Sequence, residues 1–455
     1  MARPPSVGPP SVAGSVTARL AGICLRKVSA DDRRRAALHV LDWIGCAIAG
    51  SAAEPGRVLA TWAQGDPEGP CHVIGAGRRT LWTATLVNGA VGNVLEMDDV
   101  HRTAILHPGP VVIPAALAAA ERQAASSAAF LDAVVRGYEA VIRVGMAVGP
   151  THYKYWHNTA TCGPFGAAAA ACSLFGLEPK GWIDAFGNAG TQAAGLWQVR
   201  HEPIMSKQLH NGRAAHAGLL AADLARIGFT GPTAILEGPQ GFFAAMCPGA
   251  DPHDIVRDPL TRWKIYETSF KPWPACRHAH PAIDASLDLR SEIDAGAVER
   301  VEVRTYRDAL AFCDRAEPHT PIDAKFSLQH SVAVALLDGP PPLEAFEPPA
   351  LARADVAALR AKVSVAAAEP YASAYPARYG AEVEVELADG TRRIARVPDA
   401  LGDPENPLPV EGVRAKALTL MHAAHVESAR AERIADACLA LAAGETVADL
   451  VALLP

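Results

Sequence analysis

The sequence is poor in aromatic residues and lacks long basic runs. Phe, Trp and Tyr make up 6% of the 455 residues, while alanine is plentiful, which favours closely packed helices over a β-sandwich. The formal net charge is −7, and no run of Lys and Arg is longer than residues 33–35. A nucleic-acid-binding protein needs a concentrated basic surface, so this composition argues against nucleic acid as a partner.

Cysteine pairs and long apolar segments are missing as well. The nine cysteines never form a Cys-x-x-Cys motif, which argues against a disulfide framework or a zinc ribbon and for a reducing compartment. The first residues lack the apolar core of a signal peptide, and the alanine run 167–171 is too short to span a membrane. We therefore expect a soluble, cytoplasmic protein with no membrane partner.

The length of the chain and its changes in pattern predict two domains. Residues 1–14 are rich in Pro, Ser and Gly and are expected to be a disordered tail. Helical patterns dominate residues 15–268 and return in 403–455, with the clearest starting near 110, 128, 163 and 212. We therefore predict a mainly α fold, in which a large all-helical domain is completed by the C-terminal helices.

The segment between these helical parts, residues 269–402, predicts an inserted α+β domain. Residues 301–306, 362–365 and 381–387 alternate apolar and polar side chains as strands do. The last of these meets residues 392–397 across Ala-Asp-Gly-Thr, which is a hairpin signal.

Residues 96–107 concentrate acidic and imidazole side chains within an otherwise apolar stretch. Asp98 and Asp99 are adjacent, and His101 and His107 follow within nine residues. Asp and His are the side chains that move protons near neutral pH, so this segment is a candidate catalytic site. For any single residue here, an exposed acidic loop or a surface histidine is the simpler interpretation.

Four segments place a cationic or imidazole side chain just ahead of an expected helix start. The N-terminus of a helix carries partial positive charge, so an added cation is unfavourable there unless an anion binds. Four such segments in one chain favour a multiply charged ligand such as a di- or tricarboxylate over four solvated turns. Their leading residues are His107, His157, Lys207 and Lys271.

These segments resemble the MmgE/PrpD family, which includes 2-methylcitrate dehydratase, cis-aconitate decarboxylase and iminodisuccinate epimerase. The similarity keeps the order of the family's motifs and covers about residues 15–450. The matching motifs are Met97-Asp-Asp-Val-His with Leu106-His-Pro-Gly, His157-Asn-Thr-Ala with Gly163-Pro-Phe-Gly, Lys207-Gln-Leu-His-Asn-Gly, Phe270-Lys-Pro-Trp-Pro-Ala-Cys-Arg-His-Ala-His and Phe326-Ser-Leu-Gln-His.

The resemblance implies a helical domain with an α+β lid domain, usually in a homodimer. It also implies a metal-free site without a cofactor, in the cleft between the domains, that takes a small anionic polycarboxylate. The positions carried over as catalytic are Asp98, Asp99, His101, His107, His157, Lys207 and Lys271. Those expected to contact the substrate are Glu96, Thr159, Arg277, His280 and His330.

Three positions depart from the pattern of the family's decarboxylases. Glu96 stands where they carry Asp, Val100 replaces a threonine, and His330 occupies the place of a tyrosine. A lost hydroxyl removes one donor to a substrate carboxylate, and buried sites discriminate strongly on such groups.

The chemistry predicted from these residues is abstraction of a proton next to a carboxylate, followed by loss of a leaving group or return of the proton. The resemblance implies a dehydratase-type elimination from a 2-methylcitrate-like substrate. His107 or His101 is the expected base, Asp98 or Asp99 its orienting partner, and a further histidine the acid. Epimerisation of a dicarboxylate such as iminodisuccinate and decarboxylation of the cis-aconitate type are the alternatives within the family.

Two further alternatives come from other classes of protein. One is a metal hydrolase that uses Asp98, Asp99 and His101, with His278 and His280 as further ligands. The neighbouring Lys and Arg side chains would repel its cation. The other is a non-catalytic carboxylate-binding protein, which explains the cations but not the acidic and imidazole segment.

Overall fold

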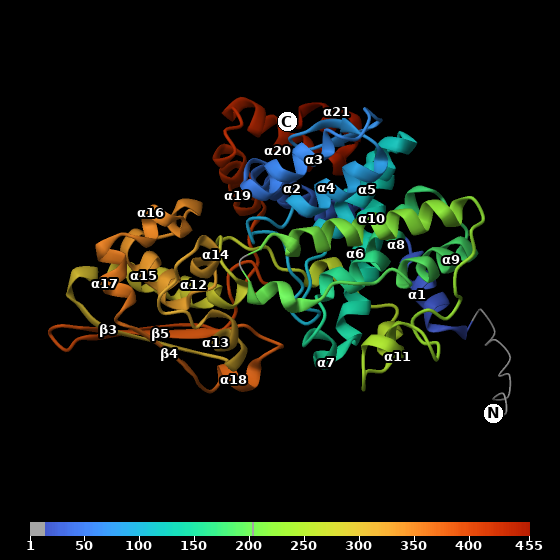
Figure 1. Ribbon diagram of the computed structural model, residues 1–455. Helices are drawn as coiled ribbons and strands as arrows, with labels where there is room; N and C mark the ends of the chain where they lie inside the picture. The colour runs from blue at the N-terminus through green and yellow to red at the C-terminus, as the bar shows by residue number, and fades with distance from the viewer. Residues whose placement is uncertain (1–13, 203) are drawn as a thin grey trace. The chain divides into compact units, whose positions relative to one another are not determined.

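The computed structural model describes residues 14–202 and 204–455 (Figure 1). Residues 1–13 of the expected disordered tail therefore lie outside the described part of the chain. By its internal contacts the chain divides into a larger unit, which contains residues 14–94, 98–267 and 414–455, and a smaller unit of residues 95–97 and 268–413. The fold is mainly α with a small β content, in agreement with the sequence.

The larger unit is built almost entirely of helices. Its only strands among the described residues are the short antiparallel pair β1 (Cys71–Val73) and β2 (Gly77–Arg79). The helices are α1 (Val16–Cys24), α2 (Ala30–Ala52), α3 (Glu54–Ala63), α4 (Leu81–Val91), α5 (Gly109–Gln123), α6 (Ser127–Ala147), α7 (Gly149–Tyr153), α8 (Asn158–Leu174), α9 (Pro179–Gly190), α10 (Ser206–Arg226), α11 (Phe242–Met246), α19 (Val410–Ala423, from residue 414 on), α20 (Ser428–Ala440) and α21 (Val447–Leu453).

Small residues bring the central helices of this unit close together. Residues 167–172 of α8 are completely buried, and α8 packs against both α6 and α10. A Cβ atom at Gly218 of α10 would lie 2.4 Å from the carbonyl oxygen of Pro164 in α8, and one at Gly166 would lie 2.7 Å from Cβ of Val141 in α6. Glycine is therefore required at both crossings, because any side chain would push the helices apart.

Two helices begin earlier than the sequence pattern predicted. The expected starts near residues 163 and 212 are wrong, since α8 begins at Asn158 and α10 at Ser206. Pro164 lies in the interior of α8. Consequently Lys207 is the second residue of α10 and not a residue ahead of it, whereas His157 is the N-cap residue of α8.

The smaller unit contains a four-stranded sheet with the order β4-β3-β5-β6. Strand β3 pairs in parallel with β4, while β3–β5 and β5–β6 are antiparallel, which confirms the predicted hairpin. The strands are β3 (Val298–Thr305), β4 (Val363–Ala367), β5 (Ala381–Leu387) and β6 (Arg392–Val397). The helices are α12 (His280–Leu289), α13 (Arg307–Cys313), α14 (Pro321–Lys325), α15 (Leu328–Asp338), α16 (Pro348–Leu351), α17 (Ala354–Arg360) and α18 (Tyr371–Ala374).

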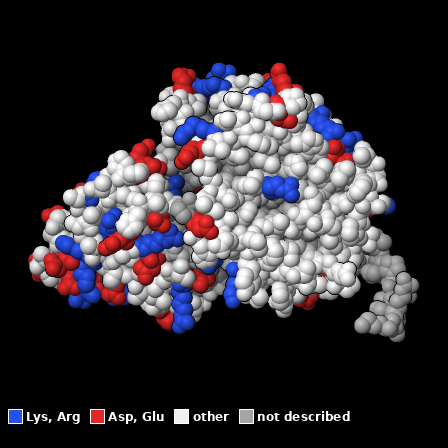
Figure 2. Space-filling view, viewed as in Figure 1, with Lys and Arg blue, Asp and Glu red and all other residues white. Residues whose placement is uncertain are grey.

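The two faces of this sheet have opposite character. Val301, Val303 and Val383 are buried in a core that they share with α12 and α15, which cover one face (Figure 1). The alternate positions form a ladder of ion pairs, in which Arg304 contacts Glu302, Glu382 and Glu384. Charged side chains are accordingly dense over the smaller unit in Figure 2.

The segment 403–413, which the sequence assigned to the C-terminal helical part, falls in the smaller unit by its contacts. Asp403 accepts a hydrogen bond from Ser269 at 2.6 Å and pairs with Arg277, and the amide of Phe270 donates to the carbonyl of Gly402 at 3.0 Å. These contacts attach the segment to the loop that carries Lys271.

Within the described residues, no single helix has both the length and the apolar character needed to cross a membrane. The pair α2 and α3, bent by 83°, meets those two criteria only when its helices are taken together.

Candidate active site

Asp98 and Asp99 are adjacent in the chain but have different partners. Both side chains are buried in the larger unit. One oxygen of Asp99 accepts hydrogen bonds from the hydroxyl of Tyr138 at 2.6 Å and from Nδ1 of His39 at 2.7 Å, and the other accepts from the amide of Gly109 at 2.9 Å. Asp99 therefore ties its segment to α2, α5 and α6, which is a positioning role.

Asp98 instead faces His107. Nδ1 of His107 lies 2.9 Å from one carboxylate oxygen of Asp98 and 3.0 Å from the carbonyl oxygen of Asp99. The side-chain amide Nδ2 of Asn93 donates to the other carboxylate oxygen of Asp98 at 2.7 Å. Because both neighbours of Nδ1 are acceptors, Nδ1 carries the proton, and Nε2 of the neutral ring is the free base. The His107 side chain is 14% exposed and that of Asp98 1%, so the imidazole is the accessible member of the pair.

A closed loop holds His107 in this place. The amide of His101 donates to the carbonyl of Leu106 at 2.9 Å, and the reverse bond closes the pair at 3.4 Å. Ile105 takes a left-handed conformation to allow the turn, with φ of 48°. The amide of His107 then donates to the hydroxyl of Thr159 in α8 at 3.0 Å. Thr159, predicted as a substrate contact, thus orients the backbone of His107.

His101 is placed as part of this loop and not as a second accessible base. Its Nδ1 accepts a hydrogen bond from the amide of Ala104 at 3.1 Å, so the proton lies on Nε2, 3.5 Å from a carboxylate oxygen of Glu267. Burial lowers the pKa of His101. The ring is 2% exposed and stabilises the turn that leads to His107.

His157, His210 and Lys207 form a second group in the larger unit. Nδ1 of His157 lies 3.3 Å from Nδ1 of His210, and the ring of Trp197 packs on His157 with 4.4 Å between centroids. Burial, followed by electrostatic interaction with Lys207, His210 and His107, lowers the pKa of His157 well below its usual range. Burial and Lys207 also lower the pKa of His210. Both imidazoles are therefore neutral near pH 7, beside one ammonium group.

The sequence did not identify several partners of these groups. His39 of α2 and Tyr138 of α6 bind Asp99, and the sequences of these two helices are typical of core helices. Lys416 of α19 is buried and forms an ion pair with Asp42 of α2 at 2.5 Å, across 374 residues of sequence. Burial raises the pKa of Asp42 to about 6, against the opposing charge of Lys416. The only available signal was a charged or polar residue within an apolar helical stretch.

The smaller unit holds the remaining predicted residues. Lys271 and Glu96 are both buried, with their charged atoms 3.8 Å apart. Lys325, which the sequence did not indicate, is buried beside them and donates to the carbonyl of Leu95 at 3.4 Å.

Arg277, His280 and His330, expected to contact the substrate, are buried and bonded within the smaller unit. Arg277 pairs with Asp403, donates to the carbonyl of Leu401 at 3.1 Å and lies 3.0 Å from His280. His280 also bonds to the carbonyl of Ala275 at 3.1 Å. His330 bonds to the carbonyl of Ala345 at 2.8 Å. Their role as substrate contacts stays a prediction.

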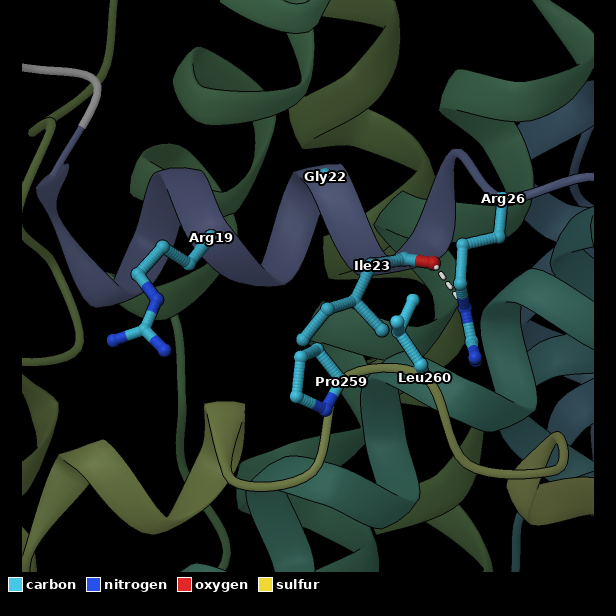
Figure 3. A pocket seen from close by; sticks show the side chains of 6 residues that line it. All are labelled: Arg19, Gly22, Ile23, Arg26, Pro259 and Leu260. Carbon is cyan, nitrogen blue, oxygen red and sulfur yellow. Dashed lines mark hydrogen bonds between the residues drawn. The ribbon is translucent and has the colours of Figure 1, made fainter.

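A surface hollow elsewhere in the larger unit contains none of these residues. It has a volume of about 250 Å³ and lies between α1 and residues 259–260 (Figure 3). One of its two arginines, Arg26, is already bonded to the carbonyl of Ile23 at 3.0 Å and paired with Glu139. Among the described residues, no group of three or more His, Cys, Asp and Glu side chains is arranged to hold a metal ion.

Comparison with known proteins matches both halves of the chain to one family. The MmgE/PrpD N-terminal domain matches residues 17–254 and the MmgE/PrpD C-terminal domain residues 273–441. The chain therefore belongs to the MmgE/PrpD family, as its motifs predicted.

The similar proteins include three that carry decarboxylase names. The cis-aconitate decarboxylase-like protein oryM of Aspergillus oryzae is 30% identical over 97% of both chains. A cis-aconitate decarboxylase of Aspergillus terreus is 28% identical over 94% of this chain and 92% of its own. The human cis-aconitate decarboxylase is 26% identical over 73% of this chain and 71% of its own.

Proposed function

We propose that this protein is a lyase that removes a proton from the carbon next to a carboxylate of a small di- or tricarboxylate. The observation that carries the proposal is the contact between Asp98 and His107, with the imidazole as the accessible member. A base of this kind suits proton abstraction at neutral pH. Membership of the MmgE/PrpD family supports the same class of substrate.

In the proposed reaction, Nε2 of His107 takes the proton from carbon. The ring becomes an imidazolium, and the negative charge of Asp98 at 2.9 Å stabilises it. The carbonyl oxygen of Asp99 keeps the Nδ1 proton in place, so Nε2 is always the atom that accepts. The lost electron pair accumulates on the neighbouring carboxylate, which needs nearby positive charge or hydrogen-bond donors.

The group of His157, His210 and Lys207 meets that need. A neutral imidazole can donate an N–H to an oxyanion, and the ammonium of Lys207 adds positive charge. For a dehydratase-type elimination, the carbon–oxygen bond breaks as the double bond forms. Lys207 then donates a proton to the departing hydroxyl, so that water leaves. The 2-methylcitrate-like dehydration is the reaction that we place first.

Decarboxylation of the cis-aconitate type is the second candidate, because relatives along nearly the full length of the chain carry that name. There the carbon–carbon bond to one carboxylate breaks, carbon dioxide leaves, and a proton is delivered to the resulting carbanion. The same imidazole and ammonium groups would serve, with His107 returning a proton instead of removing one.

Product analysis distinguishes these reactions. Metal-stripped protein is incubated with 2-methylcitrate, cis-aconitate and iminodisuccinate in D₂O, and products are followed by NMR. Loss of water from 2-methylcitrate supports the first candidate, and carbon dioxide release from cis-aconitate supports the second. Deuterium uptake into the substrate without loss of water or carbon dioxide identifies an epimerase. Activity that returns only on adding a metal ion would contradict the proposed metal-independent mechanism.

A further inference from the structure

Three charged side chains are buried together in the smaller unit. Glu96 is 4% exposed, Lys271 1% and Lys325 7%. Charged groups are taken out of water only at a substantial cost unless opposite charges and hydrogen bonds compensate them. Here the ammonium groups of Lys271 and Lys325 both lie close enough to the carboxylate of Glu96 to feel its charge. Glu347, the next acidic residue that acts on Lys325, is exposed and its charge is screened by solvent.

The hydrogen bond that Lys325 makes is long compared with the contact of the ion pair between Arg277 and Asp403. Lys271 lies 3.8 Å from Glu96, and Lys325 lies 3.4 Å from the carbonyl of Leu95. Arg277, in contrast, is bonded to Asp403, to two backbone carbonyls and to His280. An ammonium group has three donors, and the described residues engage one donor of Lys325 by a hydrogen bond. A buried ammonium group with donors left over can bind an anionic ligand.

The backbone fixes Lys325 in this position. It is the last residue of α14, whose start is capped by the side chain of Thr320. Its carbonyl oxygen accepts a hydrogen bond at 2.8 Å from the amide of Cys276, in the same loop as Lys271. Glu96 follows Leu95, which accepts the hydrogen bond from Lys325, and takes a left-handed conformation with φ of 59°. The two lysines and the carboxylate are thus attached to one another through the main chain.

We propose that Lys325 is a second carboxylate-binding residue beside Lys271, and that the two ammonium groups hold one carboxylate group of the di- or tricarboxylate substrate. This inference rests on the function proposed above. A bound carboxylate supplies acceptors for the remaining donors of Lys325. Glu96 keeps the two ammonium groups apart and charged, so that the anion enters a prepared site.

Binding of tricarballylate tests this assignment without turnover, because this tricarboxylate has no hydroxyl to eliminate. Its affinity is measured by calorimetry for the wild-type chain and for Lys325→Met, with Lys362→Met as the matched control. Lys362 belongs to the same unit and also donates to a backbone carbonyl, that of Val298 at 2.5 Å, but it is exposed. We expect Lys325→Met to weaken binding about tenfold or more and the control to stay within about twofold.

A folding control accompanies these variants. If Lys325→Met does not fold, two other variants are used. The double variant Glu96→Gln with Lys325→Met removes one charge of each sign, and Lys325→Arg keeps the cation. We expect the double variant to bind tricarballylate weakly and Lys325→Arg to retain most of the affinity. A folded variant without a cation at position 325 that binds as tightly as the wild type would overturn the inference. So would a wild-type chain that does not bind tricarballylate.

Failure of the inference and failure of the proposed function give different results. If the wild type catalyses proton exchange and Lys325→Met keeps both its KM and its tricarballylate affinity, the proposed function stands and the role of Lys325 is wrong. If the wild type binds tricarballylate through Lys325 but exchanges no proton with any of the three substrates, the binding site stands and the proposed function is wrong.

Discussion

Nδ1 of His107 lies 2.9 Å from a carboxylate oxygen of Asp98, while the next residue, Asp99, is bonded to Tyr138 and His39. One of the two adjacent carboxylates therefore faces the imidazole, and the other fixes the segment to the helices. The same division applies to the two histidines, since His101 closes the loop and His107 is left accessible. The sequence could not assign these roles, because it left Asp98 and Asp99, and also His101 and His107, as equivalent candidates.

Replacing Asp98 tests whether its charge supports the base. Asp98→Asn keeps the shape but removes the negative charge that stabilises the imidazolium, so we expect kcat to fall about 10²- to 10⁴-fold with little change in KM. Asp251→Asn is the matched control, because Asp251 lies 2.9 Å from Nδ1 of His253 in an exposed pair of the same unit. Equal kcat values for Asp98→Asn and the control would show that Asp98 has no catalytic role.

Lys207 is expected to act through its charge near His157 and His210. Lys207→Ala removes the ammonium, so we expect turnover to be lost while the far-UV circular dichroism and melting temperature stay near those of the wild type. Lys180→Ala is the comparison, since Lys180 is 76% exposed and paired with Asp184 on the surface. Removal of the Lys207 charge should also raise the pKa of His157 and His210, which NMR titration of the two rings measures. Full activity in Lys207→Ala would contradict the assignment.

His278 gives a prediction for stability against pH. Its ring is stacked between Phe312 and Tyr379, and burial lowers its pKa to about 3. The unfolded chain binds this proton near pH 6.5 and the folded chain does not, so the stability due to the neutral ring is present above pH 6.5. It is lost as the pH falls from 6.5 towards 3, by about 2 kcal/mol at pH 5.

Denaturant unfolding of wild type and His278→Gln at pH 8 and pH 5 measures this contribution. The variant is less stable at pH 8, because it loses the hydrogen bond to Tyr306 at 2.8 Å. Its stability should, however, decrease about 2 kcal/mol less between the two pH values than that of the wild type. Parallel pH dependence of the two proteins would show that folding does not lower the pKa of His278.

A homodimer is the predicted assembly, and one exposed apolar patch of the larger unit suits it. The patch comprises Tyr155, Leu196, Ile204, Met205 and Leu209, each 40–57% exposed. Exposed apolar patches commonly mark interfaces, and a twofold dimer can bury the same patch from both copies. We expect light scattering to give about twice the 47.7 kDa chain mass, and Leu209→Glu to shift it towards the monomer. Leu260→Glu, at an 86% exposed position outside the patch, should leave the mass unchanged. A wild-type monomer would contradict the prediction.

Much of the fold could be predicted because it depends on local pattern. The alternation in 381–387, the Ala-Asp-Gly-Thr turn and the strand 392–397 define the hairpin that the structure contains. The starts of α8 and α10 could not be predicted in the same way. Pro164 has no amide hydrogen, but packing against α6 and α10 keeps α8 continuous on both sides of it, so the helix begins ahead of the expected start.

The candidate site was also predictable only where it depends on local sequence motifs. The motif segments contain His107, His157 and Lys271, since these residues fall in short recognisable stretches. Their partners come from distant parts of the chain. His39 is 60 residues from Asp99, and Lys325 is 230 residues from Leu95. No local pattern records such pairs, because tertiary packing alone brings them together.

Deuterium uptake into recovered substrate tests the central claim most directly. Metal-stripped wild type and His107→Gln are incubated in D₂O with 2-methylcitrate, and deuterium at the carbon next to the carboxylate is measured by NMR as the reaction approaches equilibrium. We predict uptake with the wild type and a loss of at least about 100-fold in rate with His107→Gln. Equal uptake by the two proteins would contradict the assignment of His107 as the base.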